Sequence, residues 1–264
     1  MKVDLNDKLV RFVAQEYVNK ISNYSSEDEL NYDVHKLIHT FAVVAMAQNL
    51  IDHTKPALSP KLKKQILNAA VLHDIGRCHE FKNGIHLKVD HGKIGANLIK
   101  KHFPGMEIEA QSTLYHNKCP SDKDPQMVQP VLDYVRDADI LANIKYQIER
   151  TDLFLIHIFG NSEKSLLTPV IDREIFKSVR KRHSVEIKRI GTNNLLTKWL
   201  AQLCWFYNLK TDSGIEYAKK EKLFIRFKQT IIKKIIPLTT KNKKKQEELT
   251  QKIQTSFPDK LFLS

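Results

Sequence analysis

Apolar residues recur at three- and four-residue spacing along most of the chain, which is the pattern of amphipathic helices. The first helix is expected over about residues 5–22, and a polar segment at 22–26 follows it. The next helix, over about 31–53, is apolar on several faces, which indicates a central buried helix. Alternating β-branched runs are few and the 264 residues contain only 8 glycines, so the pattern predicts an all-α protein.

Capping signals mark where several helices begin. Ser59-Pro60 has the form of an N-cap followed by proline at the first helical position. The helix that starts there is expected to end at His73-Asp74. After a loop of about a dozen residues, Asp90 has the features of an N-cap and places His91 in a first helical turn. Asp124-Pro125 repeats the cap-plus-proline pattern before a further helix that runs to about residue 144.

Further helices are expected in the second half of the chain, over about 171–182, 192–209, 214–236 and 243–255. We find no internal repeat and no flexible linker between domains. The predicted organisation is a metal-binding core with its N-terminal helix over 1–160, and a basic helical extension over 161–264. The extension is expected to pack on the core as part of one structural domain.

Composition adds limits on the setting of the protein. The hydrophobic content of 42% is that of an ordinary globular protein, and the longest apolar stretch, Phe41–Met46, is too short to span a bilayer. The N-terminal residues lack the apolar core of a signal peptide. Three cysteines far apart indicate no disulfide framework. A cytoplasmic protein without a membrane partner is therefore expected.

The net charge of +13 is spread unevenly. Residues 1–150 hold 20 Lys+Arg against 19 Asp+Glu, whereas residues 151–264 hold 23 against 11. The basic C-terminal part would favour anionic ligands, and nucleic acid is one candidate partner. The alternative is a solvated lysine-rich surface.

The candidate chemistry centres on the adjacent pair His73-Asp74 at the end of an apolar segment. Two such groups are costly to bury unless something satisfies both, and a divalent cation does so. His39, His73, Asp74 and Asp139 make a complete set of ligands for one metal, while His91 and His116 add a second with Asp74 as the bridge. Mixed His/Asp donors suit Mn, Fe, Co, Ni, Zn or Mg. Two cations roughly 3.5–4 Å apart can activate water and stabilise the oxygens of a phosphate ester.

These residues resemble the H…HD…D signature of the HD-domain metal-dependent phosphohydrolases. The likeness covers about residues 31–145 and rests on the following segments: Ile38-His39-Thr40, His73-Asp74-Ile75-Gly76-Arg77, Asp90-His91-Gly92-Lys93-Ile94-Gly95, Tyr115-His116-Asn117 and Arg136-Asp137-Ala138-Asp139. Ile140-Leu141-Ala142 lacks the basic and acidic residues that often follow the last aspartate in the family. Asn117 stands where the cyclic-dinucleotide phosphodiesterase branch has a second histidine, and its Gly-Tyr-Pro motif is missing, which disfavours that branch.

The resemblance implies an all-α HD-domain helical bundle, here with a C-terminal helical extension, and one or two divalent metal ions. It also implies phosphatase or phosphodiesterase action, by a metal-activated hydroxide, on a nucleotide or a related phosphorylated small molecule. Asp74 and Arg77 are the expected catalytic residues, and Arg77 and Asn117 are expected to bind substrate, although Arg77 could instead form a structural salt bridge. Two other functions stay open: a non-catalytic nucleotide or nucleic-acid sensor, and a mixed-valent di-iron oxygenase.

Two neighbours of the predicted ligands compete with them for the metal. His35 lies one turn before His39 on the same helix, and a surface or supporting role is expected for it. Asp137 lies two positions before Asp139, points elsewhere on the helix, and is expected to pair with a nearby cation.

Overall fold

The structure is a computed structural model that describes residues 7–82, 85–87, 89–118, 125–159, 167–182 and 194–259. Helices dominate these residues, so the predicted all-α class is confirmed. The described strands are β1 (Phe81–Lys82) and β2 (Ile85–His86), two residues each, paired antiparallel. Among the helices of the described ranges, none has the length and apolar character needed to cross a membrane.

The chain divides into two compact units, and the boundary falls inside a helix. Unit 1 comprises Met1–Asn143 and Lys210–Gly214, and unit 2 comprises Ile144–Leu209 and Ile215–Ser264. Both α6 (Gln129–Glu149) and α10 (Asp212–Lys220) therefore begin in unit 1 and end in unit 2. The division expected at residue 160 stays a prediction.

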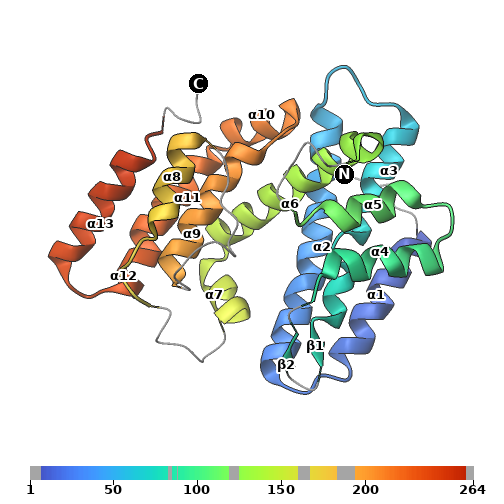
Figure 1. The fold of residues 1–264 in the computed structure, drawn as a ribbon, viewed down its shortest axis with the longest axis horizontal. Helices are drawn as coiled ribbons and strands as arrows, with labels where there is room; N and C mark the ends of the chain where they lie inside the picture. The colour runs from blue at the N-terminus through green and yellow to red at the C-terminus, as the bar shows by residue number, and fades with distance from the viewer. Residues whose placement is uncertain are drawn as a thin grey trace. The chain divides into compact units, whose positions relative to one another are not determined.

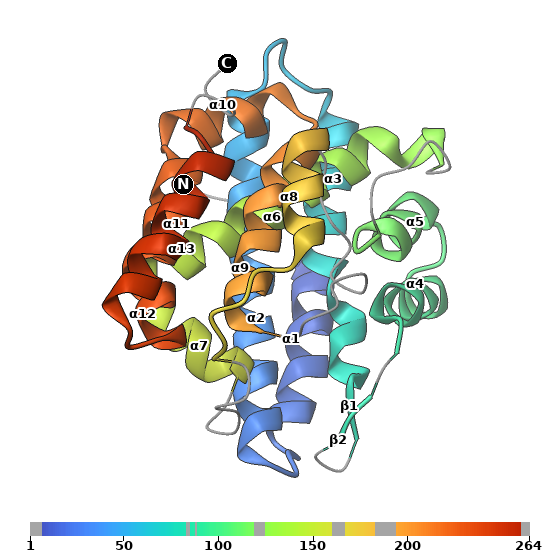
Figure 2. The same ribbon diagram turned by 60° about the vertical axis from the view of Figure 1, so that its left-hand side comes forward.

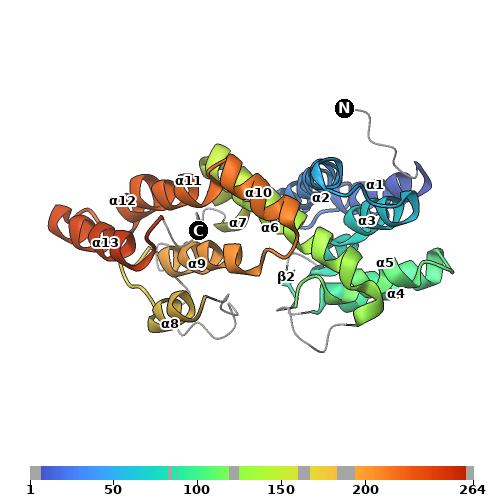
Figure 3. The same cartoon turned by 90° about the horizontal axis from the view of Figure 1, so that it is seen from above.

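Unit 1 is built on α2, which is buried on several faces, as predicted for this segment (Figure 1). Its helices are α1 (Asp7–Ile21), α2 (Glu27–His53), α3 (Pro60–Leu72), α4 (His91–His102), α5 (Glu107–Tyr115) and the first part of α6. α1, α2 and α3 contact one another, α4 packs against α5, and α5 contacts α3 (Figure 3). The predicted caps are confirmed for two of these helices: Ser59 accepts from the N–H of Leu62, and Asp90 from that of Lys93.

Unit 2 has its own core, in which aromatic rings pack at right angles or stack. The ring of Trp199 stacks on Phe227 at 5.2 Å and meets Phe154 edge-on at 5.8 Å. The helices are α7 (Thr151–Phe159), α8 (Arg173–Lys181), α9 (Leu195–Leu203), the main part of α10, α11 (Leu223–Thr230), α12 (Ile236–Thr239) and α13 (Lys243–Ser256). α9 packs against both α8 and α11 (Figure 2). The described residues of the C-terminal part are therefore mostly helical, as predicted.

The structure divides two of the predicted helices. The segment 214–236 was expected to be continuous, but α10 ends at Lys220 and α11 begins at Leu223. Lys222 between them adopts a left-handed conformation, with φ of 52°, that no α-helix accommodates. The segment 192–209 contains α9 followed by a 3-10 helix over Cys204–Asn208. The cap predicted at Asp124 lies outside the described residues.

Candidate metal centre

The end of α3 brings the His73-Asp74 pair into the interior of unit 1. His73 is the C-cap residue of α3 and is fully buried, and Asp74, 2% exposed, begins the turn into a 3-10 helix over Ile75–His79. The hydroxyl of Tyr17 on α1 donates to the backbone carbonyl of Asp74 at 3.0 Å. The pair is thus held by both the helix end and a neighbouring helix.

Two glycines allow the other histidines to approach this pair. A Cβ on Gly76 would lie 2.0 Å from the carbonyl oxygen of His91, so only glycine lets the 3-10 helix pack directly on α4. A Cβ on Gly92 would lie 2.9 Å from the carbonyl oxygen of Thr113, so α4 also packs closely on α5. This packing carries His91 at the start of α4, and His116 at the end of α5, toward Asp74.

The two carboxylate oxygens of Asp74 face two different pairs of histidines. Oδ2 lies 3.6 Å from Nε2 of His73 and 3.9 Å from Nε2 of His39. Oδ1 lies 3.3 Å from Nε2 of His116 and 3.6 Å from Nε2 of His91. Each pair forms with Asp74 a group whose ligand atoms lie within 4.8 Å of one another, and within the described ranges these are the groups of that kind. Both groups are able to hold a metal ion.

Asp139 joins the first group through His39. Its Oδ1 lies 2.9 Å from Nε2 of His39, and the side-chain amide of Asn143 donates to the same oxygen at 2.8 Å. Asn143 comes one helical turn after Asp139, so it supports the carboxylate although Ile140-Leu141-Ala142 lacks the polar residues common in the family. All six residues predicted as ligands therefore come together in unit 1.

The proton positions of two histidines follow from their hydrogen bonds. Nδ1 of His73 lies 2.8 Å from the carbonyl oxygen of Ala70, and Nδ1 of His116 lies 2.7 Å from that of Thr113. A carbonyl oxygen only accepts, so Nδ1 carries a proton in each ring. In both rings Nε2 is on the side of Asp74. This is the arrangement of metal-ligating histidines, whose other nitrogen donates to a fixed acceptor.

His73 supplies a direct test of whether a cation fits. Its Nε2 is buried and has no hydrogen-bond partner within the described part of the chain. Burial lowers the pKa of this imidazole to about 4, so the ring is neutral near pH 7 and presents a bare lone pair. An unsatisfied buried acceptor costs about 1–3 kcal/mol, which a bound cation would remove. The residues therefore fit a metal ion.

Two basic side chains lie next to Asp74. Nε of Arg77 donates to Oδ1 at 3.1 Å, and Nζ of Lys36 lies 3.5 Å from Oδ2. Burial opposes the ionised form of Asp74, yet Arg77, His73 and Lys36 outweigh it and lower the pKa of the carboxyl well below its usual range. Asp74 is therefore an anion, which is the state that binds a metal.

Arg77 and Asn117, predicted to bind substrate, both lie at this cluster. Arg77 forms the salt bridge weighed as its alternative role, to Asp74 and also to Glu80 at 2.9 Å. Its side chain is 24% exposed. The amide of Asn117 donates to Nε2 of His91 at 3.2 Å, which is the ring nitrogen that lies on the side of Asp74.

Sequence reasoning missed two charged residues of the site, Lys36 and Glu80. Lys36 is 9% exposed, and its spacing to His39, one helical turn on α2, could have identified it. Glu80 is 3% exposed and accepts from Nδ1 of His91 at 3.1 Å. It lies one turn after Arg77, but nothing in the sequence pairs it with His91 across the hairpin.

The structure decides between the roles expected for His35 and corrects the one expected for Asp137. His35 is 3% exposed and its ring stacks near that of His39 at 6.3 Å, so of the two expected roles the supporting one fits. Asp137 does not depend on a cation, because its carboxylate accepts from the backbone N–H groups of Lys210 and Thr211 and from the Thr211 hydroxyl. These partners lie more than 70 residues away, beyond the reach of a local pattern.

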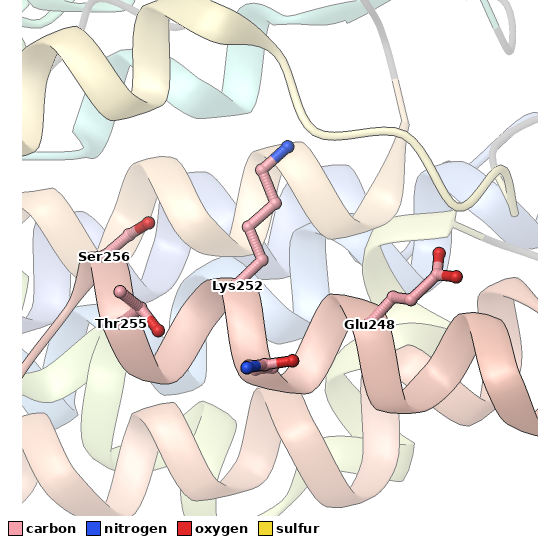
Figure 4. A pocket seen from close by; sticks show the side chains of 5 residues that line it. Glu248, Lys252, Thr255 and Ser256 are labelled. Atoms are coloured by element: carbon pink, nitrogen blue, oxygen red, sulfur yellow. The ribbon is translucent and has the colours of Figure 1, made fainter.

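A shallow hollow lies on the surface of α13 in unit 2 (Figure 4). One helix alone lines it, with the residues Glu248, Gln251, Lys252, Thr255 and Ser256. Nζ of Lys252 lies 4.7 Å from the ring centre of Phe176, so this cation is already engaged. We assign the hollow no chemistry.

A comparison with known protein families finds a match to the segment that contains this cluster. Residues 37–144 match the family model described as the HD domain. No curated protein and no solved structure matches the chain. The His/Asp cluster lies inside the matched segment and is consistent with an HD metal site. The HD domain defines a superfamily of metal-dependent phosphohydrolases.

Proposed function

We propose that this protein hydrolyses a phosphomonoester or phosphodiester of a nucleotide or a related small molecule, with one or two divalent cations as cofactor. The observation that carries the proposal is the position of the buried Asp74 carboxylate, with one oxygen toward His39 and His73 and the other toward His91 and His116. A bridging carboxylate with separate ligand groups on its two oxygens is the arrangement of a two-metal phosphoesterase site.

His39, His73, Asp74 and Asp139 would hold the first cation, and His91 and His116 with Asp74 the second. When bound, such cations supply an activated water and offset negative charge on phosphoryl oxygens. The charge state of the residues supports this role, because the rings of His73 and His91 are kept neutral by burial, which lowers their pKa, while Asp74 is ionised.

Lys36 and Arg77 would bind the phosphoryl group. Both basic groups lie within 3.5 Å of Asp74, on its Oδ2 and Oδ1 sides respectively. Burial lowers the pKa of the Lys36 ammonium group, and the nearby charge of Asp74 opposes that shift. A phosphate that reaches the site would meet two fixed positive groups, and charge-assisted hydrogen bonds to them would orient it. Nζ of Lys36 has three donors and lies 3.5 Å from Oδ2 of Asp74, whereas Arg77 is held by both Asp74 and Glu80. We therefore assign the larger part of phosphoryl binding to Lys36.

The test combines elemental analysis with a screen of phosphoesters. Purified protein would be depleted of metal, reloaded separately with Mn²⁺, Ni²⁺, Co²⁺, Zn²⁺, Mg²⁺ or Fe²⁺, and assayed on p-nitrophenyl phosphate, bis-p-nitrophenyl phosphate and a nucleotide panel. Metal-dependent turnover that Asp74→Asn abolishes supports the proposal. Lack of turnover with every cation contradicts it, and oxygen consumption by iron-loaded protein would favour an oxygenase instead.

A further inference from the structure

Glu80 connects three separate elements beside the proposed second cation. Its Oε1 accepts from Nδ1 of His91 on α4 at 3.1 Å and from Nη1 of Arg77 at 2.9 Å. Its Oε2 accepts from the hydroxyl of Tyr32 on α2. The side chain is 4% exposed, and every one of these contacts is a donor to the carboxylate.

The partner of His91 differs in kind from those of the other rings. Nδ1 of His73 and Nδ1 of His116 each donate to a neutral backbone carbonyl three residues earlier in their own segment. Nδ1 of His91 faces a carboxylate from another segment, 11 residues away. Because an ionised carboxylate accepts only, it requires the proton on Nδ1. Nε2 then keeps its lone pair, accepts from the amide of Asn117 at 3.2 Å and lies 3.6 Å from Oδ1 of Asp74. The carboxylate also raises the basicity of Nε2 more than a carbonyl does.

We propose that Glu80 is a positioning residue that sets the affinity of the cation held by Asp74 Oδ1, His91 and His116, without setting that of the cation at His39 and His73. This inference rests on the proposed function, since it takes the six His/Asp residues as ligands. Glu80 acts through His91: it fixes the tautomer, turns Nε2 toward Asp74 and strengthens it as a donor to the cation. It contacts neither the cation nor the substrate.

Glu80 could also affect the second cation through its contact with Arg77, and the experiment must distinguish this effect from the one through His91. Glu80 also holds the guanidinium that lies 3.1 Å from Asp74 Oδ1. If Glu80 acted by holding Arg77, removal of Arg77 would weaken the second cation as much as removal of Glu80. If it acts through His91, Arg77→Gln leaves the affinity of that cation unchanged or raises it, because a competing positive charge is lost.

The experiment is a titration of metal-free protein with Mn²⁺, in which calorimetry and electron paramagnetic resonance measure the binding of each ion. The wild type should take two ions, and His116→Gln identifies the step that belongs to the second group. Glu80→Gln should weaken that step by about 10–100-fold and leave the other within about twofold. Glu109→Gln is the matched control, because Glu109 is also a buried carboxyl of unit 1, 6% exposed, and bonds Asn68 rather than a histidine.

A second readout follows the ring itself. In ¹H–¹⁵N spectra of the metal-free protein, the His91 signal, assigned with a His91→Gln variant, should be that of the Nδ1-protonated tautomer. Glu80→Gln should keep much of this form, and Glu80→Ala should shift the ring toward a tautomer mixture. The inference is overturned if both steps weaken equally, if neither weakens, or if Arg77→Gln reproduces the loss. A wild type that binds no ion overturns the proposed function as well. A wild type that binds a single ion, or one that binds two ions with an unaffected Glu80→Gln, overturns this inference alone.

Discussion

Nε2 of His116 and Oδ1 of Asp74 lie 3.3 Å apart, although 42 residues separate them in the chain. The contact exists because Gly76 and Gly92 let the 3-10 helix, α4 and α5 pack with almost no space between their backbones. The 3-10 helix, α4 and α5 thus define one half of the proposed metal centre, and no single hydrophobic pattern in the sequence links these three segments.

The first prediction concerns this close packing. Gly76→Ala should destabilise the protein by about 3 kcal/mol or more, because its Cβ would lie 2.0 Å from the carbonyl oxygen of His91 and the backbone must move. Gly105→Ala is the comparison, since Gly105 has φ of 95° but nothing within 4 Å of an added Cβ. It should cost only about 1 kcal/mol of backbone strain. Urea unfolding of both variants measures the difference, and equal losses would argue against the packing described.

The second prediction concerns Lys36. Lys36→Gln should lower kcat/KM for a phosphoester by about 10–100-fold, since charge-assisted hydrogen bonds to a phosphoryl group are worth about 1.5–3 kcal/mol. The number of bound cations should stay the same, because Lys36 is not a ligand. Lys61→Gln, on the exposed start of α3, is the control and should match the wild type. Steady-state kinetics with parallel metal analysis separates the two effects. Unchanged kinetics in Lys36→Gln would remove this residue from the substrate site.

The third prediction concerns the pH dependence of stability. Both carboxylate oxygens of Asp33 are buried without a hydrogen-bond partner in the described residues. Burial, and then the neighbouring charge of Glu29, raise the pKa of this carboxyl to about 7. In the unfolded chain the pKa of this carboxyl is about 3.9, so the free energy of unfolding falls as the pH rises from about 4 to about 7. Over this range the carboxyl ionises in the unfolded chain but stays protonated in the folded protein.

Asp33→Asn should remove that dependence. Relative to the wild type, the variant should gain about 1–3 kcal/mol of unfolding free energy between pH 5 and pH 8. Asp28→Asn, an exposed neighbour on α2, should show no such gain. Denaturant midpoints at several pH values measure both. A difference that does not change with pH would show that Asp33 is ionised in the folded protein throughout this range.

The part of the site that could be predicted from the sequence is the part with a local signature. The His73-Asp74 pair, the N-caps at Ser59 and Asp90, and the order of the remaining histidines are visible because each depends on near neighbours in the chain. The residues around them were harder to find. Glu80 meets His91 only because a short hairpin folds back, and no spacing rule expresses that.

Tertiary partners also explain the misassigned residues. Asp137 was expected to pair with a cation, yet the backbone N–H groups of Lys210 and Thr211, just before α10, bind its carboxylate. The sequence near Asp137 does not indicate these partners. The break at Lys222 has a similar origin, since a lysine in a left-handed conformation carries no glycine or proline signal. Helix existence was therefore predictable, while helix ends and buried polar partners were not.

A fourth prediction concerns removal of the metal. Cations that bind the folded protein and not the unfolded chain stabilise it, by about 2.7 kcal/mol at 100 times their Kd. Chelation should therefore lower the Tm of the wild type by several degrees, and added Mn²⁺ should restore it. In Asp74→Asn the same treatment should leave Tm unchanged, because both proposed cation groups depend on that carboxylate. A chelator effect of equal size in Asp74→Asn would place the responsible cation elsewhere.

The most direct test of the proposed metal centre is the count of Mn²⁺ ions bound per chain, measured by equilibrium dialysis with elemental analysis for the wild type and Asp74→Asn. Asp74 bridges the two groups, so the wild type should bind two ions, and the variant should lose both at the same Mn²⁺ concentration. Loss of a single ion in the variant, or equal binding by both proteins, would contradict the role of Asp74 as the bridge.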